Sequence, residues 1–180
     1  GDTWDYTATQ HMILAELEIG GELRKVIMQA PKNGFFYVLD RVTGEFISAE
    51  EYIPITWATH VDPETGRPVE SDNARYQVAN PLLDLPLEEQ VAVLAAMTAE
   101  EIEAAYHKPG PLGGHNWHPM SFSPETGLLY VPTMQGGAFP FSVDENYQYE
   151  PAGWNIGIGL GTMTDRSVRP DDQYAGGTGP

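Results

Sequence analysis

The chain has 180 residues, and its 26 acidic and 9 basic side chains give a formal net charge of -17 at pH 7. That charge repels phosphate backbones and anionic lipid surfaces, which excludes nucleic acid as a partner. The absence of cysteine excludes disulfides, thiolate metal ligands and a thiol nucleophile within this stretch, and no run of about 18 apolar residues predicts a membrane span.

Three short strands are predicted in the first quarter of the chain. Residues 11–19 nearly alternate between apolar and polar side chains, and Gly20 and Gly21 form a tight connection to the next strand. Two apolar runs, 25–30 and 35–40, flank a turn made by Pro, Lys, Asn and Gly, which is a hairpin signal. We therefore expect a meander of antiparallel strands.

The pattern Asp/Ser-x-x-Thr-Gly occurs at residues 40–44, 62–66 and 123–127. Its first side chain caps a type I turn, and its Gly accepts the positive φ at the exit. Three copies in a strand-rich sequence predict repeated hairpins, and a β-propeller of four-stranded blades is the leading architecture that uses them. At about 40–50 residues per blade the chain holds at most about four blades, so a closed ring needs more chain or a partner.

One segment, residues 86–108, interrupts the β pattern because it is rich in Ala, Glu and Leu. Thr98 and Glu101 form a capping box, which predicts two short helices at 87–97 and 99–107, ended by Pro109 and Gly110. The expected fold is all-β, a partial β-propeller with a short α-helical insertion at 86–108.

The five histidines predict no metal site. His115 and His118 have i, i+3 spacing, but zinc needs at least one more protein ligand and no cysteine is present, so structural roles are favoured. His11, His60 and His107 are scattered and form no pattern.

The two ends of the chain indicate an internal piece of a longer protein. The start, from Gly1 to Asp5, has no methionine and neither the basic nor the apolar region of a signal peptide. The last six residues are a Gly-rich stretch that is typical of a loop.

Three stretches resemble signature sequences of the quinoprotein alcohol dehydrogenases, which depend on pyrroloquinoline quinone (PQQ), and they occur in the same order as in that family. They are residues 1–10 (GDTWDYTATQ), 30–41 (APKNGFFYVLDR) and 113–120 (GGHNWHPM). The resemblance covers most of the chain, but not the helical segment or the C-terminal end. It implies that residues 1–180 are part of a single propeller domain, open at both ends, which is eight-bladed in the full-length family.

The resemblance implies a periplasmic enzyme that oxidises primary alcohols to aldehydes by hydride transfer to PQQ, assisted by calcium. The family's catalytic base is the Asp of a Trp-Asp-Tyr/Phe step, which falls on Asp5; this residue is also the expected metal ligand. A carboxylate suits the base because a neighbouring dication keeps it ionised. A small alcohol is the expected substrate, and a cytochrome c or another acceptor takes the electrons. A haem c domain, present in some members, would lie outside this chain.

The resemblance also assigns three cofactor contacts. Lys32 matches the cation that binds the quinone oxygens, where a fixed positive charge stabilises the reduced cofactor. Asn116 matches a contact made by its side-chain amide. Trp117 matches a contact made mainly by its backbone. The family's Glu and Asn calcium ligands and the Trp under the cofactor are expected upstream of Gly1. Lanthanide-using members carry a second Asp two residues after the base, where this chain has Thr7, so calcium is the expected metal.

Other functions fit the sequence less well. A non-catalytic propeller that binds protein partners is the main alternative, but it has no need of Asp5, Lys32 and Asn116 together. A glycosidase with Asp2 and Asp5 as its acid–base pair is disfavoured, because nothing else resembles a sugar site. Trp154 and Asn155 fit the wall of an alcohol pocket and fit core packing equally well.

Overall fold

The computed structural model describes residues 4–72, 74–75, 85–101, 107–137, 142–143, 147–153, 155 and 158–159. Its elements in chain order are β1 (Ile13–Ile19), β2 (Glu22–Gln29), β3 (Phe35–Asp40), β4 (Phe46–Glu51), β5 (Ala58–Val61), β6 (Pro68–Glu70), α1 (Leu87–Ala96), β7 (Ser121–Ser123), β8 (Leu128–Tyr130), β9 (Ser142–Val143) and β10 (Ile158–Gly159).

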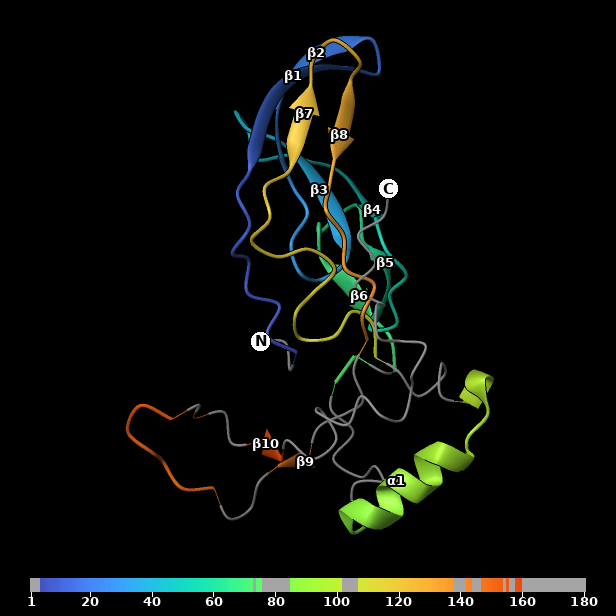
Figure 1. Cartoon of the computed structure of the whole chain (residues 1–180). Helices are drawn as coiled ribbons and strands as arrows, with labels where there is room; N and C mark the ends of the chain where they lie inside the picture. The colour runs from blue at the N-terminus through green and yellow to red at the C-terminus, as the bar shows by residue number, and fades with distance from the viewer. Residues whose placement is uncertain are drawn as a thin grey trace.

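The strands β1 to β4 form an antiparallel sheet in chain order, which confirms the predicted meander and adds a fourth strand (Figure 1). Ile19 pairs with Glu22 across the connection predicted at Gly20 and Gly21. Both glycines have positive φ, 63° and 84°, a conformation that side chains disfavour. The tight turn between β1 and β2 therefore depends on these two glycines.

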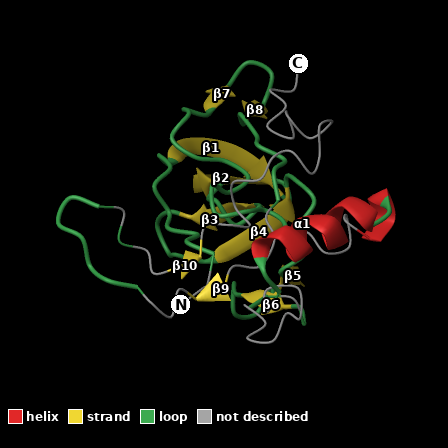
Figure 2. Cartoon of the chain, turned by 60° about the horizontal axis from the view of Figure 1, so that its bottom comes forward, coloured by secondary structure: helices red, strands yellow, loops and turns green. Residues whose placement is uncertain are grey.

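The two faces of this sheet are both covered, as the alternation along β3 requires. Phe35 and Tyr37 pack in a cluster with Trp57 and residues of β5, while Val38 packs in a second cluster with residues of β1 and β2. Phe122 of β7 joins that second cluster together with Leu129 of β8. The hairpins β5–β6 and β7–β8 therefore lie on opposite sides of the sheet (Figure 2).

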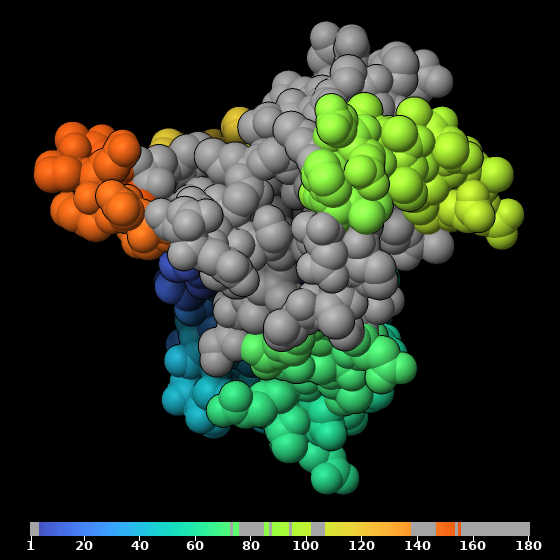
Figure 3. All heavy atoms as spheres, turned by 90° about the horizontal axis from the view of Figure 1, so that it is seen from below, coloured from blue at the N-terminus to red at the C-terminus, as the bar shows by residue number. Residues whose placement is uncertain are grey.

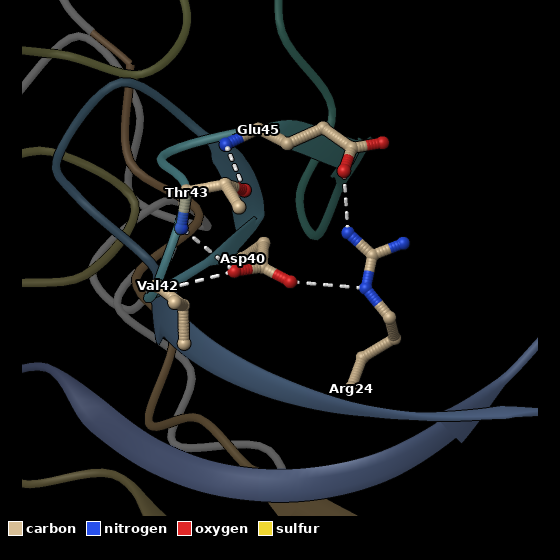
Figure 4. Close-up of polar contacts among 5 residues, drawn as sticks. All are labelled: Arg24, Asp40, Val42, Thr43 and Glu45. Atoms are coloured by element: carbon tan, nitrogen blue, oxygen red, sulfur yellow. Dashed lines mark hydrogen bonds and ion pairs between the residues drawn. The ribbon is translucent and has the colours of Figure 1, made fainter.

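The Asp/Ser-x-x-Thr-Gly segments are the turns that the sequence predicts. One carboxylate oxygen of Asp40 accepts the backbone N–H groups of Val42 and Thr43, at 2.8 and 3.0 Å, and the other binds Arg24 (Figure 4). These backbone donors lower the pKa of Asp40 to about 2, so its carboxylate is ionised at neutral pH. In residues 62–66 the Asp62 carboxylate accepts the equivalent two backbone N–H groups. In residues 123–127 the Ser123 hydroxyl accepts one of them, from Thr126.

The helix α1 lies within the segment that the sequence predicts to be helical, and it stands out at the edge of the molecule (Figure 3). The capping box is present, since Thr98 Oγ1 accepts the Glu101 N–H at 3.2 Å and the Glu101 carboxylate accepts the Thr98 N–H at 2.8 Å. Residues 99–101 are helical and residues 102–106 lie outside the described part. That this segment is an insertion stays a prediction. No helix among the described residues is long and apolar enough to span a membrane.

Candidate active site

Asp5 and Lys32 are in direct contact. The Lys32 Nζ donates to the Asp5 Oδ2 and to the Asp5 main-chain oxygen, both at 3.0 Å. The lysine is buried, with 7% of its surface exposed, whereas the Asp5 side chain is 70% exposed. Because lysine is seldom buried without a partner, this pair marks a built site: a buried cation holds a carboxylate that faces solvent.

The backbone of Asp5 adopts a strained conformation. Its φ is +59°, in the left-handed region, which residues with a Cβ seldom adopt, although aspartate tolerates it better than most. The surrounding contacts help to hold such a conformation. The hydrogen bond from Lys32 to the Asp5 carbonyl oxygen is one contact that does so.

Two hydrogen bonds keep the Asp5 carboxylate charged. The Thr7 Oγ1 donates to Oδ1 at 2.7 Å, and this bond, followed by the one from Lys32, lowers the pKa of Asp5 below its ordinary value. The group is therefore ionised at neutral pH. An exposed, ionised carboxylate can accept a proton or bind a cation.

The loop that begins at Gly113 lies directly over Lys32. The Gly114 N–H donates to the Lys32 carbonyl oxygen at 2.9 Å. A Cβ on Gly113 would lie 2.4 Å from the Lys32 Cγ and 2.6 Å from its Cα, and its φ is +80°. This close approach requires glycine, and it connects the third signature stretch to the second.

Replacement of Gly113 by alanine is expected to displace Lys32 from Asp5. For the alcohol oxidation that the resemblance implies, we expect kcat/KM of a full-length protein containing this chain to fall by at least about 10-fold, because small misplacements at a reacting centre are costly. Gly127→Ala is the matched control, since Gly127 also has a positive φ, +69°, but no atom within 4 Å of its Cβ position. Steady-state rates of the two variants test this, and equal losses would contradict it.

The third signature stretch is anchored by His115, which is fully buried. One ring nitrogen lies 2.6 Å from the carbonyl oxygen of Ala30, and the other lies 2.7 Å from that of His118. The Gln10 side chain donates to the main-chain carbonyl oxygen of His115 at 2.9 Å. These contacts support the predicted structural role of His115 and attach residues 113–118 to the end of β2.

Asn116 and Trp117 follow this anchor. The Asn116 Nδ2 donates to the Leu112 carbonyl oxygen at 2.9 Å, while its Oδ1 is buried and has no hydrogen-bond partner among the described residues. A buried acceptor of this kind calls for a donor or a cation. Trp117 is 82% exposed, so its indole is open to a ligand or to another part of a longer chain.

These residues fit PQQ and calcium, the two groups that the resemblance implies. The described contacts of Lys32 use two of its three N–H donors, which leaves one for a ligand oxygen. Asp5 offers anionic oxygens, the ligands that calcium prefers. Among the described residues, no three His, Asp or Glu side chains group together to hold a metal ion.

Comparison with known families identifies the fold to which this geometry belongs. Residues 1–155 match the family described as "PQQ: Glucose/ethanol/alcohol dehydrogenase, beta-propeller domain". The chain belongs to this family. The prediction of an all-β, partial β-propeller fold is thereby confirmed, and the β1–β4 sheet has the four antiparallel strands of a propeller blade.

Individual relatives agree with this assignment. The chain is 51% identical over 132 residues to quinohemoprotein alcohol dehydrogenase ADH IIB of Pseudomonas putida. This match covers 73% of this chain and 16% of the relative. The solved quinohemoprotein alcohol dehydrogenase of Comamonas testosteroni matches with 41% identity and a TM-score of 0.62, over 84% of this chain and 19% of that one. A europium-containing methanol dehydrogenase matches with 30% identity and a TM-score of 0.61, over 79% and 21%. The chain therefore spans about a fifth of the length of these proteins.

The structure brings together some predicted residues and one that sequence reasoning missed. Asp5 and Lys32 are in contact, and Asn116 and Trp117 follow the glycines that pack on Lys32. His107, which fits no sequence pattern, contacts both neighbours of Asp5. No local signal could have revealed this, because 101 residues separate His107 from Tyr6.

Trp154 and Asn155, which fit a pocket wall and core packing equally well in the sequence, are not joined to this site by any described contact. Trp154 lies outside the described residues. Asn155 binds within its own loop, where its side chain contacts Tyr147, Glu150 and Gly153 at 2.8 to 3.0 Å. For Asn155 these bonds favour a structural role in the turn.

Proposed function

We propose that this chain is the part of a longer, periplasmic PQQ-dependent alcohol dehydrogenase that carries the catalytic base. Asp5 is the base, and Lys32, Asn116 and Trp117 bind the cofactor. The observation that carries the proposal is the Asp5–Lys32 contact, in which a buried ammonium group fixes an exposed carboxylate. Both residues lie within residues 1–155, which match the family, and in stretches that resemble its signature sequences.

The residues of this chain supply acid–base chemistry and charge. Asp5 accepts the hydroxyl proton of a primary alcohol while a hydride leaves the carbon that becomes the aldehyde. When bound, PQQ supplies the two-electron acceptor for that hydride, and calcium polarises its accepting carbonyl. The Lys32 ammonium keeps Asp5 in place and offers its remaining N–H to a quinone oxygen. Electrons then leave to a cytochrome c or another acceptor.

Further parts of the site come from outside these 180 residues. Asp5 is the expected calcium ligand in this chain, and the resemblance places the family's Glu and Asn ligands upstream of Gly1. Two relatives are named quinohemoproteins, which supports a haem group in the same enzyme, and the resemblance makes haem c the expected type. Such a group would have to be bound outside this chain, which contains no cysteine to attach it.

The proposal is tested by reconstitution of two proteins side by side. A full-length enzyme containing this chain is expected to oxidise primary alcohols in a dye-linked assay when PQQ and calcium are added. The isolated 180-residue chain should show no turnover and should aggregate, because an open propeller exposes unpaired sheet edges and lacks the remaining ligands. Clear turnover by the isolated chain would contradict the architecture, and an inactive full-length protein would contradict the function.

A further inference from the structure

Both sequence neighbours of Asp5 contact the same imidazole ring. The Trp4 ring stacks on the His107 ring with 3.5 Å between centroids and 9° between planes. The Tyr6 hydroxyl lies 2.9 Å from the His107 Nε2. Trp4 and His107 are buried, with 1% and 4% of their surfaces exposed. Asp5, between the two contacts, is exposed, and Tyr6 is half-buried.

The hydrogen bond between His107 and Tyr6 has a defined direction. The Tyr6 hydroxyl donates its single proton to the Pro109 carbonyl oxygen at 2.6 Å. Its oxygen therefore accepts from His107, whose Nε2 must carry the hydrogen. His107 thus holds Trp4 by stacking and Tyr6 by donation, and these two interactions can be removed separately.

The segment that carries His107 is itself fixed to the strand region. The Thr56 N–H donates to the Lys108 carbonyl oxygen at 2.9 Å, and the Lys108 N–H donates to the Thr56 Oγ1 at 2.8 Å. The neighbouring Trp57 packs against Tyr6, with 5.5 Å between the ring centroids, and donates to the Asn33 carbonyl oxygen at 2.8 Å. Asn33 follows Lys32, so one continuous set of contacts supports both members of the Asp5–Lys32 pair.

The strained backbone of Asp5 explains why such support is needed. The φ of Asp5 is +59°, an uncommon conformation for a residue with a Cβ even though aspartate tolerates it, and contacts around it help to hold it. Lys32 acts on Asp5 itself, whereas His107 acts on the residues before and after it. We propose that His107 is a positioning residue, which fixes the backbone on both sides of Asp5 so that the carboxylate keeps its place beside Lys32. This inference rests on the proposed role of Asp5 as the base.

The test uses two substitutions of His107 in the full-length enzyme. His107→Phe keeps a ring that can stack on Trp4 but removes the donor to Tyr6, and His107→Ala removes both contacts. His60→Phe and His60→Ala are the controls, since His60 is exposed on β5 and its only described side-chain contact is with Thr59. Tyr6→Phe breaks the same hydrogen bond from the other side, so the double variant Tyr6→Phe/His107→Phe should lose less than the sum of the two single losses.

Two measurements distinguish positioning from a purely structural role. In the apo-protein, amide hydrogen exchange in the peptide that contains residues 4–7 should become at least about 10-fold faster in both His107 variants, while exchange in β3 stays unchanged. In the PQQ-loaded enzyme, kcat should fall by at least about 10-fold while the KM for the alcohol and the quinone content change little. Both His60 variants should match the unmodified enzyme in both measurements.

Each outcome decides the inference. Unchanged exchange at residues 4–7 in His107→Phe and His107→Ala would overturn it, and so would a loss of kcat that appears only together with faster exchange in β3. If exchange rises locally but Asp5→Asn remains fully active, the positioning role stands and the assignment of Asp5 as the base fails.

Discussion

Replacement of Asp5 by asparagine in the full-length enzyme is expected to lower kcat for a primary alcohol by at least about 10²-fold, the scale of losing a general base. Asparagine keeps the shape of the side chain, and its amide oxygen can accept a hydrogen bond from Lys32 or Thr7. It cannot take a proton at neutral pH. Because the contacts of Lys32 with the Asp5 backbone and with the loop at Gly113 are unchanged, quinone content should stay close to that of the unmodified enzyme.

Asp62→Asn is the matched control for this loss. It makes the same change of charge and shape at a carboxylate that caps a turn by accepting backbone N–H groups, which an amide oxygen also does. Steady-state rates and PQQ content of the two variants are measured together. An Asp5→Asn enzyme within about 2-fold of the unmodified rate would rule out Asp5 as the base, and a parallel loss of PQQ would assign Asp5 to cofactor binding.

The strands and turns of this chain could be predicted because they depend on local sequence. The two apolar runs 25–30 and 35–40 around a Pro/Asn/Gly turn predict a hairpin, and β2 and β3 do pair antiparallel. The Asp/Ser-x-x-Thr-Gly pattern specifies its turn through bonds within five residues, and the capping box at Thr98 does so within four. No long-range information is needed for these features.

The arrangement of the site could be predicted only in part. Motif resemblance singled out Asp5 and Lys32. Lysine is usually exposed, so the sequence alone does not predict the burial of Lys32. That burial depends on the close approach of Gly113, which lies more than 80 residues later in the chain. The stacking of His107 on Trp4 likewise depends on how distant segments meet. Contacts of this kind follow from the tertiary fold, so a scan along the sequence assigned His107 no role.

The same contacts bear on the alternative of a non-catalytic propeller. A scaffold gains little from holding an exposed carboxylate in a left-handed backbone conformation beside a buried ammonium group, because both the strain and the burial of charge oppose folding. A catalytic site makes use of such a group, since a base must be fixed and open to its substrate. The geometry at Asp5 therefore favours an enzyme over a protein-binding module.

The metal preference of the full-length enzyme is expected to depend on Thr7. Its Oγ1 lies 2.7 Å from the Asp5 Oδ1, so an aspartate at this position would place a second carboxylate beside the first. Two like charges this close repel each other unless a cation lies between them, and a trivalent ion compensates them better than a divalent one. We therefore expect Thr7→Asp to raise the ratio of lanthanum-supported to calcium-supported activity by at least about 10-fold, whereas the unmodified enzyme regains activity with calcium and gains none from lanthanum.

Thr7→Asn separates charge from shape in this experiment, because it offers a neutral oxygen ligand of the same size as aspartate. Each apo-enzyme is prepared with a chelator, loaded with PQQ, and assayed after addition of calcium or lanthanum. If negative charge decides the preference, Thr7→Asn should keep the calcium preference of the unmodified enzyme and only Thr7→Asp should change it. Equal shifts in both variants would assign the effect to side-chain shape, and an unmodified enzyme that works only with lanthanum would show that calcium is not its metal. Because Thr7 is exposed and donates its described side-chain hydrogen bond to Asp5 alone, a change in preference can be attributed to the site and not to altered folding.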